Sequence, residues 1–243
     1  MPFANNTTLI TTADTLVIAA DGVDGTIEDT SARATAFIVQ AGATGHDKIV
    51  GFGQNDSLLM DHKLYDSNND GIVSFGENSV LDLDRTSKSA GSDRLEFAAF
   101  DSKALRFLGN KDGHWVYADA SVRLAGFTEG TVGNDTFDGA GGNKTFFFDN
   151  ALGLNLGGDT IKNFTAGDFI VTTSKIFDAT KDAEVTFGKN GVLDLSGEGG
   201  AADTDPTKHP GGQIDVVGAS SVFFDHQETI HGVTYYYYGA VAP

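Results

Sequence analysis

Oxygen-bearing side chains alternate along residues 66–77, which read DSNNDGIVSFGE. Carboxylate or amide groups stand at positions 1, 3, 5 and 12 of this segment, and a glycine that permits a sharp turn stands at position 6. Calcium is a hard cation that takes about six to eight oxygen ligands, so this spacing suits it. The residues that we expect to bind calcium through side-chain or main-chain oxygen are Asp66, Asn68, Asp70, Ile72, Ser74 and Glu77.

This segment resembles the calcium loop of an EF-hand, in which position 7 contributes a main-chain carbonyl and position 9 acts directly or through water. The flanks differ from an EF-hand, because VSF and VLDLD are β-branched and alternating where a long helix would follow. A metal-free surface turn is the alternative, since Asp, Asn and Gly form turns on their own. We therefore expect a calcium loop that lies between strands.

Composition limits the classes of protein that the 243-residue chain can belong to. A formal charge of −18 argues against nucleic acid and anionic membranes as partners, because both would repel the protein. No apolar stretch is long enough to predict insertion into a membrane. The absence of cysteine excludes disulfides and thiolate metal sites, and it fits both the cytoplasm and exported proteins that use calcium as a staple.

The elements that would position these ligands repeat along the chain. Residues 47–84 align without gaps to residues 159–196 at an offset of 112, with fifteen identities in thirty-eight positions. A weaker repeat follows each copy, near Asp93 and near Ile214, once a longer loop at residues 197–212 is allowed for. The chain is therefore predicted to hold two copies of one strand-rich unit.

The second copy of the calcium loop has lost the residue types that bind the ion. Thr180 replaces the amide, Ala183 replaces the turn glycine and Lys189 replaces the closing glutamate. We expect only the first copy to bind calcium.

A shorter repeat has a period of nine residues. Residues 42–50 (GATGHDKIV) and 51–59 (GFGQNDSLL) each place an aspartate at the sixth position and a large apolar residue two places later. Residues 130–138 (GTVGNDTFD) do the same, whereas 139–147 (GAGGNKTFF) carries a lysine at the sixth position. The spacing returns once more at Asp159 and Asp168. Glycine-rich turns at this interval predict short strands joined by tight turns.

These nonapeptides resemble the GGxGxDxUx repeat of the RTX family, the calcium-binding parallel β-roll of exported bacterial proteins. The resemblance implies that aspartates and neighbouring carbonyls hold calcium between stacked turns while the large apolar residue points into the roll. Residues 145–168 are similar to the strands that cap the roll in serralysin-like members. The calcium ligands that the resemblance implies are Asp47, Asp56, Asp135, Asp159 and Asp168.

The same resemblance implies a route out of the cell. Members of this family leave through an ABC-type (type I) exporter, guided by an uncleaved C-terminal signal. The N-terminal residues lack the basic segment and apolar core of a secretory signal, and the chain ends in the apolar GVTYYYYGAVAP. A twisted strand packed on both faces is the other interpretation of the four tyrosines. We expect an extracellular or cell-surface protein that folds when it meets calcium.

No catalytic motif is evident. None of the six histidines forms HExxH, and GxSxG, Walker and dinucleotide motifs are absent, so we expect a non-enzyme. Trp115 beside Tyr117 could form a platform for a polysaccharide, or Trp115 could be a core residue on a strand. A cytosolic calcium sensor is a third hypothesis, which the lack of helical flanks and of an intact second loop disfavours.

The sequence therefore predicts an all-β protein, either β-roll or β-solenoid-like or a sandwich, built from a duplicated unit with Gly/Asp-rich calcium turns. The two units are expected at residues 1–125 and 126–243. The first functional hypothesis is a calcium-stabilised exported structural or adhesion protein, whose partner would be a cell-surface polysaccharide or protein. The alternative is a polysaccharide-binding or polysaccharide-active extracellular protein.

Overall fold

The computed structural model describes residues 13–40, 42–86, 91–195 and 212–243, so most of the longer loop at 197–212 lies outside the described residues. The protein is essentially all-β, with 44% strand and 3% helix, which confirms the predicted fold class. Its described helices are two short 3-10 turns, η1 (Ala120–Val122) and η2 (Asn150–Leu152). No described helix is long and apolar enough to cross a bilayer.

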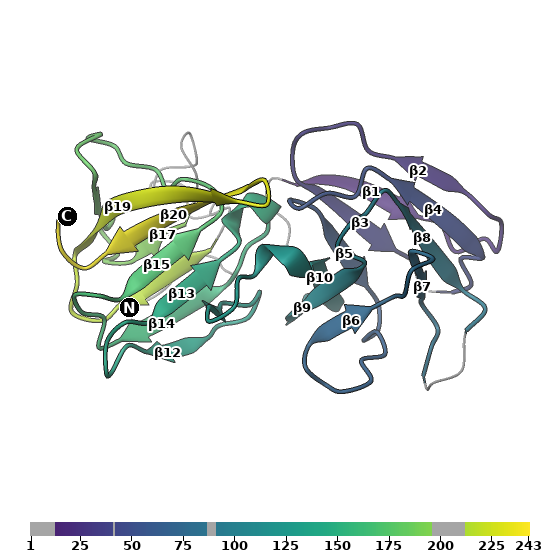
Figure 1. Cartoon of the computed structure of the whole chain (residues 1–243), viewed down its shortest axis with the longest axis horizontal. Coiled ribbons are helices and arrows are strands. Elements are labelled where there is room, and N and C mark those ends of the chain that lie inside the picture. The colour runs from purple at the N-terminus through teal and green to yellow at the C-terminus, as the bar shows by residue number, and fades with distance from the viewer. Residues whose placement is uncertain (1–12, 41, 87–90, 196–211) are drawn as a thin grey trace. The chain divides into compact units, whose positions relative to one another are not determined.

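The described chain forms two compact units that divide between Val122 and Arg123 (Figure 1). The N-terminal unit contains ten strands, which alternate between two sheets as the chain proceeds from β1 to β5. The strands of the N-terminal unit are β1 (Asp14–Ile18), β2 (Thr26–Glu28), β3 (Thr35–Val39), β4 (His46–Val50), β5 (Ser57–Met60), β6 (Ile72–Ser74), β7 (Val80–Asp82), β8 (Arg94–Ala98), β9 (Ala104–Lys111) and β10 (His114–Asp119).

The first five strands form a short parallel roll. β1, β3 and β5 pair in parallel in one sheet, and β2 and β4 pair in parallel in the other. One full coil takes 21 or 22 residues, since Asp14 pairs with Thr35 and Thr26 with Lys48. The nine-residue spacing of the sequence therefore corresponds to about half a coil, and each turn carries the chain from one sheet to the other.

Antiparallel strands complete both sheets of the N-terminal unit. The strand order is β1-β3-β5-β10-β9-β6 in the larger sheet and β2-β4-β8-β7 in the smaller. In the larger sheet, β10 pairs antiparallel with β5. In the smaller sheet, β8 pairs in parallel with β4, and β7 pairs antiparallel with β8. The parallel series of the larger sheet therefore ends at β5.

Apolar side chains from both sheets meet in one core. Buried residues come from both sheets, including Phe37 and Leu58 on the larger and Ile49 and Phe97 on the smaller. Phe97 makes an edge contact with Phe52 at a centroid distance of 5.1 Å. Such offset and edge-to-face pairs add to the free energy gained from burial alone. Because strand side chains alternate, the inward positions of the two sheets form this core.

The C-terminal unit repeats the same topology. Its sheets have the orders β11-β13-β15-β20-β19-β16 and β12-β14-β18-β17, so each strand has a counterpart ten numbers earlier in the N-terminal unit. The strands of the C-terminal unit are β11 (Thr128–Glu129), β12 (Thr136–Asp138), β13 (Thr145–Phe148), β14 (Gly158–Lys162), β15 (Phe169–Thr172), β16 (Glu184–Thr186), β17 (Leu193–Asp194), β18 (Gln213–Val216), β19 (Ser221–Ile230) and β20 (Val233–Gly239).

The four consecutive tyrosines of the C-terminal unit lie in β20, which pairs with β15 on one side and β19 on the other. Tyr235 and Tyr238 are almost completely buried. The run therefore forms a central strand of the larger sheet, as β-branched and aromatic residues favour.

Candidate metal sites

The Asp66 carboxylate organises the loop that follows β5. Its Oδ1 accepts hydrogen bonds from the backbone N–H groups of Asn68 at 3.2 Å and Asn69 at 2.9 Å, and its Oδ2 accepts one from Gly71 at 2.8 Å. Asn69 and Gly71 both adopt the left-handed conformation, at φ 57° and 81°. Asparagine and glycine tolerate this conformation best, which explains why the loop carries them there.

Two further oxygen-bearing side chains meet beside Asp66. The Asn68 amide donates to Asp70 Oδ2 at 2.8 Å, and Asp70 Oδ1 accepts the N–H of Ile72 at 2.8 Å. Asn68 and Asp70 thus lie side by side. Rotation of the amide about its last torsion would present oxygen in place of nitrogen at the same point.

The second half of the segment is a strand and a turn. Ile72 and Ser74 are the first and last residues of β6, which pairs antiparallel with β9. Glu77 lies in the turn between β6 and β7, and its main-chain carbonyl accepts a hydrogen bond from Lys103 Nζ at 3.1 Å. Within the described ranges, no three His, Cys, Asp or Glu side chains gather closely enough to hold a metal, so Glu77 does not join Asp66 and Asp70 in such a group.

A buried tyrosine fixes the start of the loop. The Tyr117 hydroxyl accepts the N–H of Leu64 at 2.8 Å, and burial raises the pKa of Tyr117 to about 12. The equivalent bond recurs in the C-terminal unit, where Ile176 N–H donates to the Tyr238 hydroxyl at 2.8 Å. Both copies of the loop are thus anchored to the central strand of their sheet.

The degenerate loop of the C-terminal unit keeps the same backbone arrangement. Asp178 accepts the N–H groups of Thr180 at 3.0 Å, Lys181 at 2.8 Å and Ala183 at 3.1 Å. Burial opposes the ionisation of Asp178, but these hydrogen bonds and that of the Thr180 hydroxyl outweigh it and lower its pKa. Lys181 and Ala183 adopt the left-handed conformation without being asparagine or glycine, at φ 58° and 71°.

The aspartates of the nonapeptides join successive coils in the N-terminal unit. Asp47 lies in β4, and its Oδ1 accepts the N–H of Gly25 from the previous coil at 2.8 Å. Asp56, just before β5, accepts the N–H of Thr35 at 2.9 Å and that of Gly53 at 2.6 Å. Both aspartates are buried, and they serve turns at opposite ends of the strands.

The C-terminal unit has the same links between coils. Asp159 accepts the N–H of Asp135 at 2.7 Å, and Asp168 accepts that of Lys144 at 2.9 Å. Asp135 binds within its own turn, where its Oδ2 accepts the N–H and the hydroxyl of Thr131. Each aspartate that the RTX resemblance implies as a ligand thus accepts at least one backbone hydrogen bond.

Asp47 lies in acidic surroundings. Its Oδ2 is buried and has no hydrogen-bond partner among the described residues. Burial raises the pKa of Asp47 and outweighs the hydrogen bond from Gly25, which lowers it. The nearby charges of Asp21 and Asp24 raise the pKa further. Asp24 in turn accepts the N–H of His46 at 3.0 Å. The charges of Asp21 and Asp24 therefore act on Asp47, although the three carboxylates are not gathered closely enough to form a metal site as they stand.

Burial also raises the pKa of Asp56, to about 6, although the N–H groups of Gly53 and Thr35 act in the opposite direction. Desolvation disfavours the charged form, so an uncompensated carboxylate here favours a proton or a cation.

Sequence reasoning missed Asp21 and Asp24. They lie in DGVDGT, one coil before the nonapeptide of Asp47, and the pairing of β2 with β4 is what stacks the two turns. The signal was present in the spacing of Gly22 and Gly25, three residues apart, which recurs at Gly42 and Gly45.

Trp115 packs against its own unit. Its ring stacks on Phe107 at 5.4 Å between centroids, Lys63 Nζ lies 5.9 Å from its centre, and it contacts the core. The indole is therefore engaged in packing within the N-terminal unit.

Comparison with known proteins adds no family to this description: no protein-family model, curated protein or solved structure matches the chain.

Proposed function

We propose that the protein binds calcium and uses it to hold the turns of its β-roll together, as an exported structural or adhesion-type protein. The observation that carries the proposal is the buried Asp47 Oδ2, which has no hydrogen-bond partner among the described residues and lies near two further carboxylates. A buried carboxylate oxygen without a partner is costly, and a bound cation would remove the cost.

The Asp66 loop is the second candidate site. Asp66, Asn68 and Asp70 lie together there, and the loop backbone is already turned around the Asp66 carboxylate. Calcium would need to recruit further oxygens, from main-chain carbonyls, from water or from Glu77 after a movement of its turn. These residues would hold the ion, and the ion would supply positive charge to an otherwise uncompensated acidic surface.

The charge of −18 also supports the proposal. Self-repulsion destabilises a compact acidic chain, and bound divalent cations relieve it. Export belongs to the same proposal. Where calcium is scarce the folded state would gain nothing from it, and at millimolar calcium binding would stabilise the fold by mass action. The resemblance of the nonapeptides to RTX repeats supports this route and an extracellular or surface location.

The test is a thermal melt of the whole chain by circular dichroism, in EGTA and again in millimolar calcium. Binding at about one hundred times Kd stabilises by about 2.7 kcal/mol, which corresponds to a rise of several degrees in Tm. Identical melts in the two solutions would contradict the proposal.

Matched variants assign the two sites. Asp47→Asn keeps an acceptor for Gly25 but removes the charge, and Asp70→Asn removes one carboxylate from the intact loop. The control is Asp182→Asn, the same change in the degenerate loop. We expect Asp47→Asn and Asp70→Asn each to reduce the calcium-dependent rise in Tm, and Asp182→Asn to leave it unchanged.

A further inference from the structure

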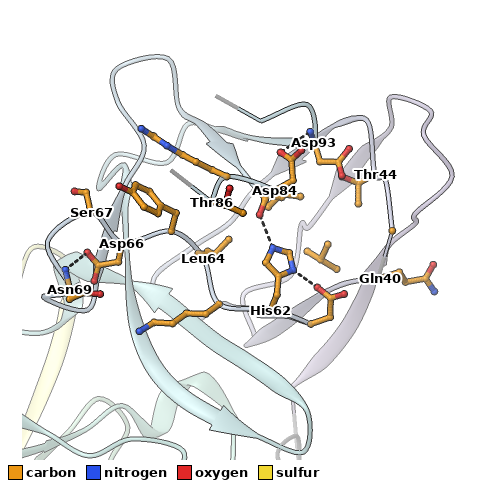
Figure 2. Close-up of a pocket in the computed structure, with 17 residues that line it drawn as sticks. Gln40, Thr44, His62, Leu64, Asp66, Ser67, Asn69, Asp84, Thr86 and Asp93 are labelled. Atoms are coloured by element: carbon orange, nitrogen blue, oxygen red, sulfur yellow. Dashed lines mark hydrogen bonds and ion pairs between the residues drawn. The ribbon is translucent and has the colours of Figure 1, made fainter. Parts of the chain in front are cut away.

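The N-terminal unit contains a pocket of about 780 Å³ beside the Asp66 loop (Figure 2). The β3–β4 connection, the segment after β5 and the segment after β7 line it. Figure 2 shows His62 between two groups of polar side chains, with Asp84 and Asp93 on one side and Asp66 on the other. The volume lies within the range of small-molecule sites.

His62 holds two walls of the pocket together. Its Nδ1 lies 2.5 Å from Asp61 Oδ1, and its Nε2 lies 2.7 Å from the main-chain oxygen of Leu83. Both partners are acceptors, so the positively charged imidazole, with a hydrogen on each ring nitrogen, fits both contacts. Burial opposes this charge, but the hydrogen bonds to Leu83 and Asp61 outweigh it and raise the pKa of His62. The charge of Asp61 is thereby compensated.

The chain itself occupies the equivalent place in the C-terminal unit. At the offset of 112, the counterparts of Asp61, His62 and Leu83 are Thr173, Ser174 and Leu195. These counterparts are bound by three consecutive residues of the β13–β14 connection. Asp149 Oδ1 accepts the Thr173 hydroxyl, Asn150 bonds the main chain of both Ser174 and Leu195, and Ala151 N–H donates to Thr173.

The difference arises from the length of one connection. Residues 149–157 join β13 to β14, whereas residues 40–45 join β3 to β4, which is three residues shorter. The longer connection forms η2 and buries Leu152, Leu154 and Leu156. The counterpart of Leu156 is Thr44, which is 1% exposed, lines the pocket and has a hydroxyl without a hydrogen-bond partner among the described residues.

The polar groups of the pocket determine what it could hold. Asp84 already accepts the N–H and hydroxyl of Ser92 and the N–H of Asp93, and the Arg85 guanidinium lies 5.2 Å from the centre of the Tyr65 ring. The carboxylates of the lining disfavour an anionic ligand, and its polar groups disfavour an apolar one. Hydroxyl groups both donate and accept, so they can donate to the Asp93 carboxylate and accept from donors of the lining.

We infer that the pocket of the N-terminal unit, which the C-terminal unit fills with its own β13–β14 connection, binds a neutral saccharide residue. The Asp93 carboxylate accepts hydrogen bonds from the sugar hydroxyls, and Thr44 meets the buried end of the ligand. Trp115 does not line this pocket. Asp66, Ser67 and Asn69 of the candidate calcium loop also line the pocket, so binding is tested with calcium removed.

The test is saturation-transfer NMR on the whole chain in EGTA, with maltose, cellobiose, xylobiose and lactose in turn at millimolar concentration. Galacturonate and glucosamine serve as charged probes. Asp93→Asn removes the acceptor charge, Thr44→Leu introduces the residue of the filled unit, and Asp101→Asn removes an exposed carboxylate outside the pocket as the control.

We expect at least one neutral disaccharide to receive saturation, with affinity about tenfold lower or weaker in Asp93→Asn and unchanged in Asp101→Asn. Thr44→Leu should abolish the signal. If Thr44→Leu fails to fold by circular dichroism, the Asp93 and Asp101 pair carries the comparison. The inference is overturned if no neutral disaccharide receives saturation, if a charged probe binds more tightly than all of them, or if the signal survives in Asp93→Asn at full strength.

Discussion

The two copies of the acidic loop have nearly the same backbone and different side chains. Asp66 and Asp178 each accept three backbone N–H groups at equivalent positions, and the residues at positions 4 and 6 are left-handed in both loops. Only the first copy keeps the amide, the turn glycine and the closing glutamate. The loop conformation therefore depends on the first aspartate and survives the loss of the other calcium-binding residues. The backbone conformation alone does not identify a calcium site, and the side-chain oxygens at the other ligand positions have to be compared.

The largest expected effect concerns the coil-linking aspartates that both units share. The folded-state pKa of Asp56 is about 6, above its ordinary value of 3.8. Its protonated form therefore stabilises the fold below about pH 4, and we expect about 3 kcal/mol of this stability to be lost as the pH rises through 6. Asp56→Asn cannot titrate. In EGTA, the difference in unfolding free energy between the variant and the wild type should change by this amount between pH 4 and 7.

Urea denaturation followed by Trp115 fluorescence measures this difference, because the only tryptophan lies in the N-terminal unit. Asp101→Asn, exposed in the same unit, is the control. A difference that stays constant across this pH range would show that burial does not perturb Asp56.

The next effect is loss of the aspartate that shapes each loop. Asp66→Ala and Asp178→Ala each leave three backbone N–H groups without their acceptor, and we expect each to destabilise its unit by about 2 kcal/mol in EGTA. Because the pKa of Asp178 is lowered, its contribution is present above about pH 4 and is lost as the pH falls below that.

Calcium then separates the two variants. Asp66→Ala should also lose stabilisation by calcium, whereas Asp178→Ala should keep it; thermal melts in EGTA and in calcium measure both terms. Equal calcium responses in the two variants would remove the functional distinction between the loops.

A smaller effect is expected from a hydroxyl that one unit has and the other lacks. Asp168 Oδ2 accepts both the N–H and the hydroxyl of Thr165, while Asp56 Oδ2 accepts only the N–H of Gly53, the counterpart of Thr165. A Cβ at Gly53 would meet nothing closer than 3.5 Å. Gly53→Thr should lower the pKa of Asp56 and stabilise the N-terminal unit by about 1.5 kcal/mol at pH 7.

Gly53→Ala is the control, since it adds the Cβ without the hydroxyl. The gain of the threonine variant over the alanine variant, measured by urea denaturation, should be full at pH 7 and small at pH 4, because Asp56 binds a proton in the folded state as the pH falls through about 6. A gain that is the same at both pH values would assign it to the backbone.

The smallest effect comes from exchanging the residue at position 6. Ala183 has φ 71°, which costs an alanine about 1 kcal/mol relative to glycine, so Ala183→Gly should stabilise the C-terminal loop by about that amount. The reverse change, Gly71→Ala, should destabilise by a similar amount, because φ is 81° there although a Cβ would meet nothing within 4 Å. Hydrogen exchange of the loop amides measures both, and same-sign effects would contradict this explanation.

The repeat was the strongest guide to the fold. Between Asp47 and Asp84 the offset of 112 is constant, and it matched β4 to β14 and β5 to β15. The strands before this region correspond at smaller offsets, 110 for β2 and β12 and 109 for β3 and β13. The offset rises to 112 after these strands because the β13–β14 connection is longer than the β3–β4 connection by about three residues. A gapless alignment cannot show that shift, so both the filled place in one unit and the pocket in the other were missed.

The candidate sites were predictable only in part. The pairing of Asn68 with Asp70 follows from their spacing, but the place of Glu77 depends on how β6 and β7 are joined. An aspartate that links two coils and an aspartate that binds calcium have the same sequence pattern. What distinguishes the surroundings of Asp47 is the pair of nearby carboxylates, Asp21 and Asp24, which only the stacking of residues 21–25 on residues 42–47 reveals.

Because of the position of β10, parallel coils could be added to the roll at one end only. In the larger sheet of the N-terminal unit β10 lies antiparallel against β5, so a parallel coil cannot follow β5 without displacing it. β1 and β2 end their sheets in the described chain. A designer who wished to lengthen this protein would therefore insert coils of about 21 residues ahead of β1, in the spacing that β1 and β3 already use, and would leave the antiparallel end untouched.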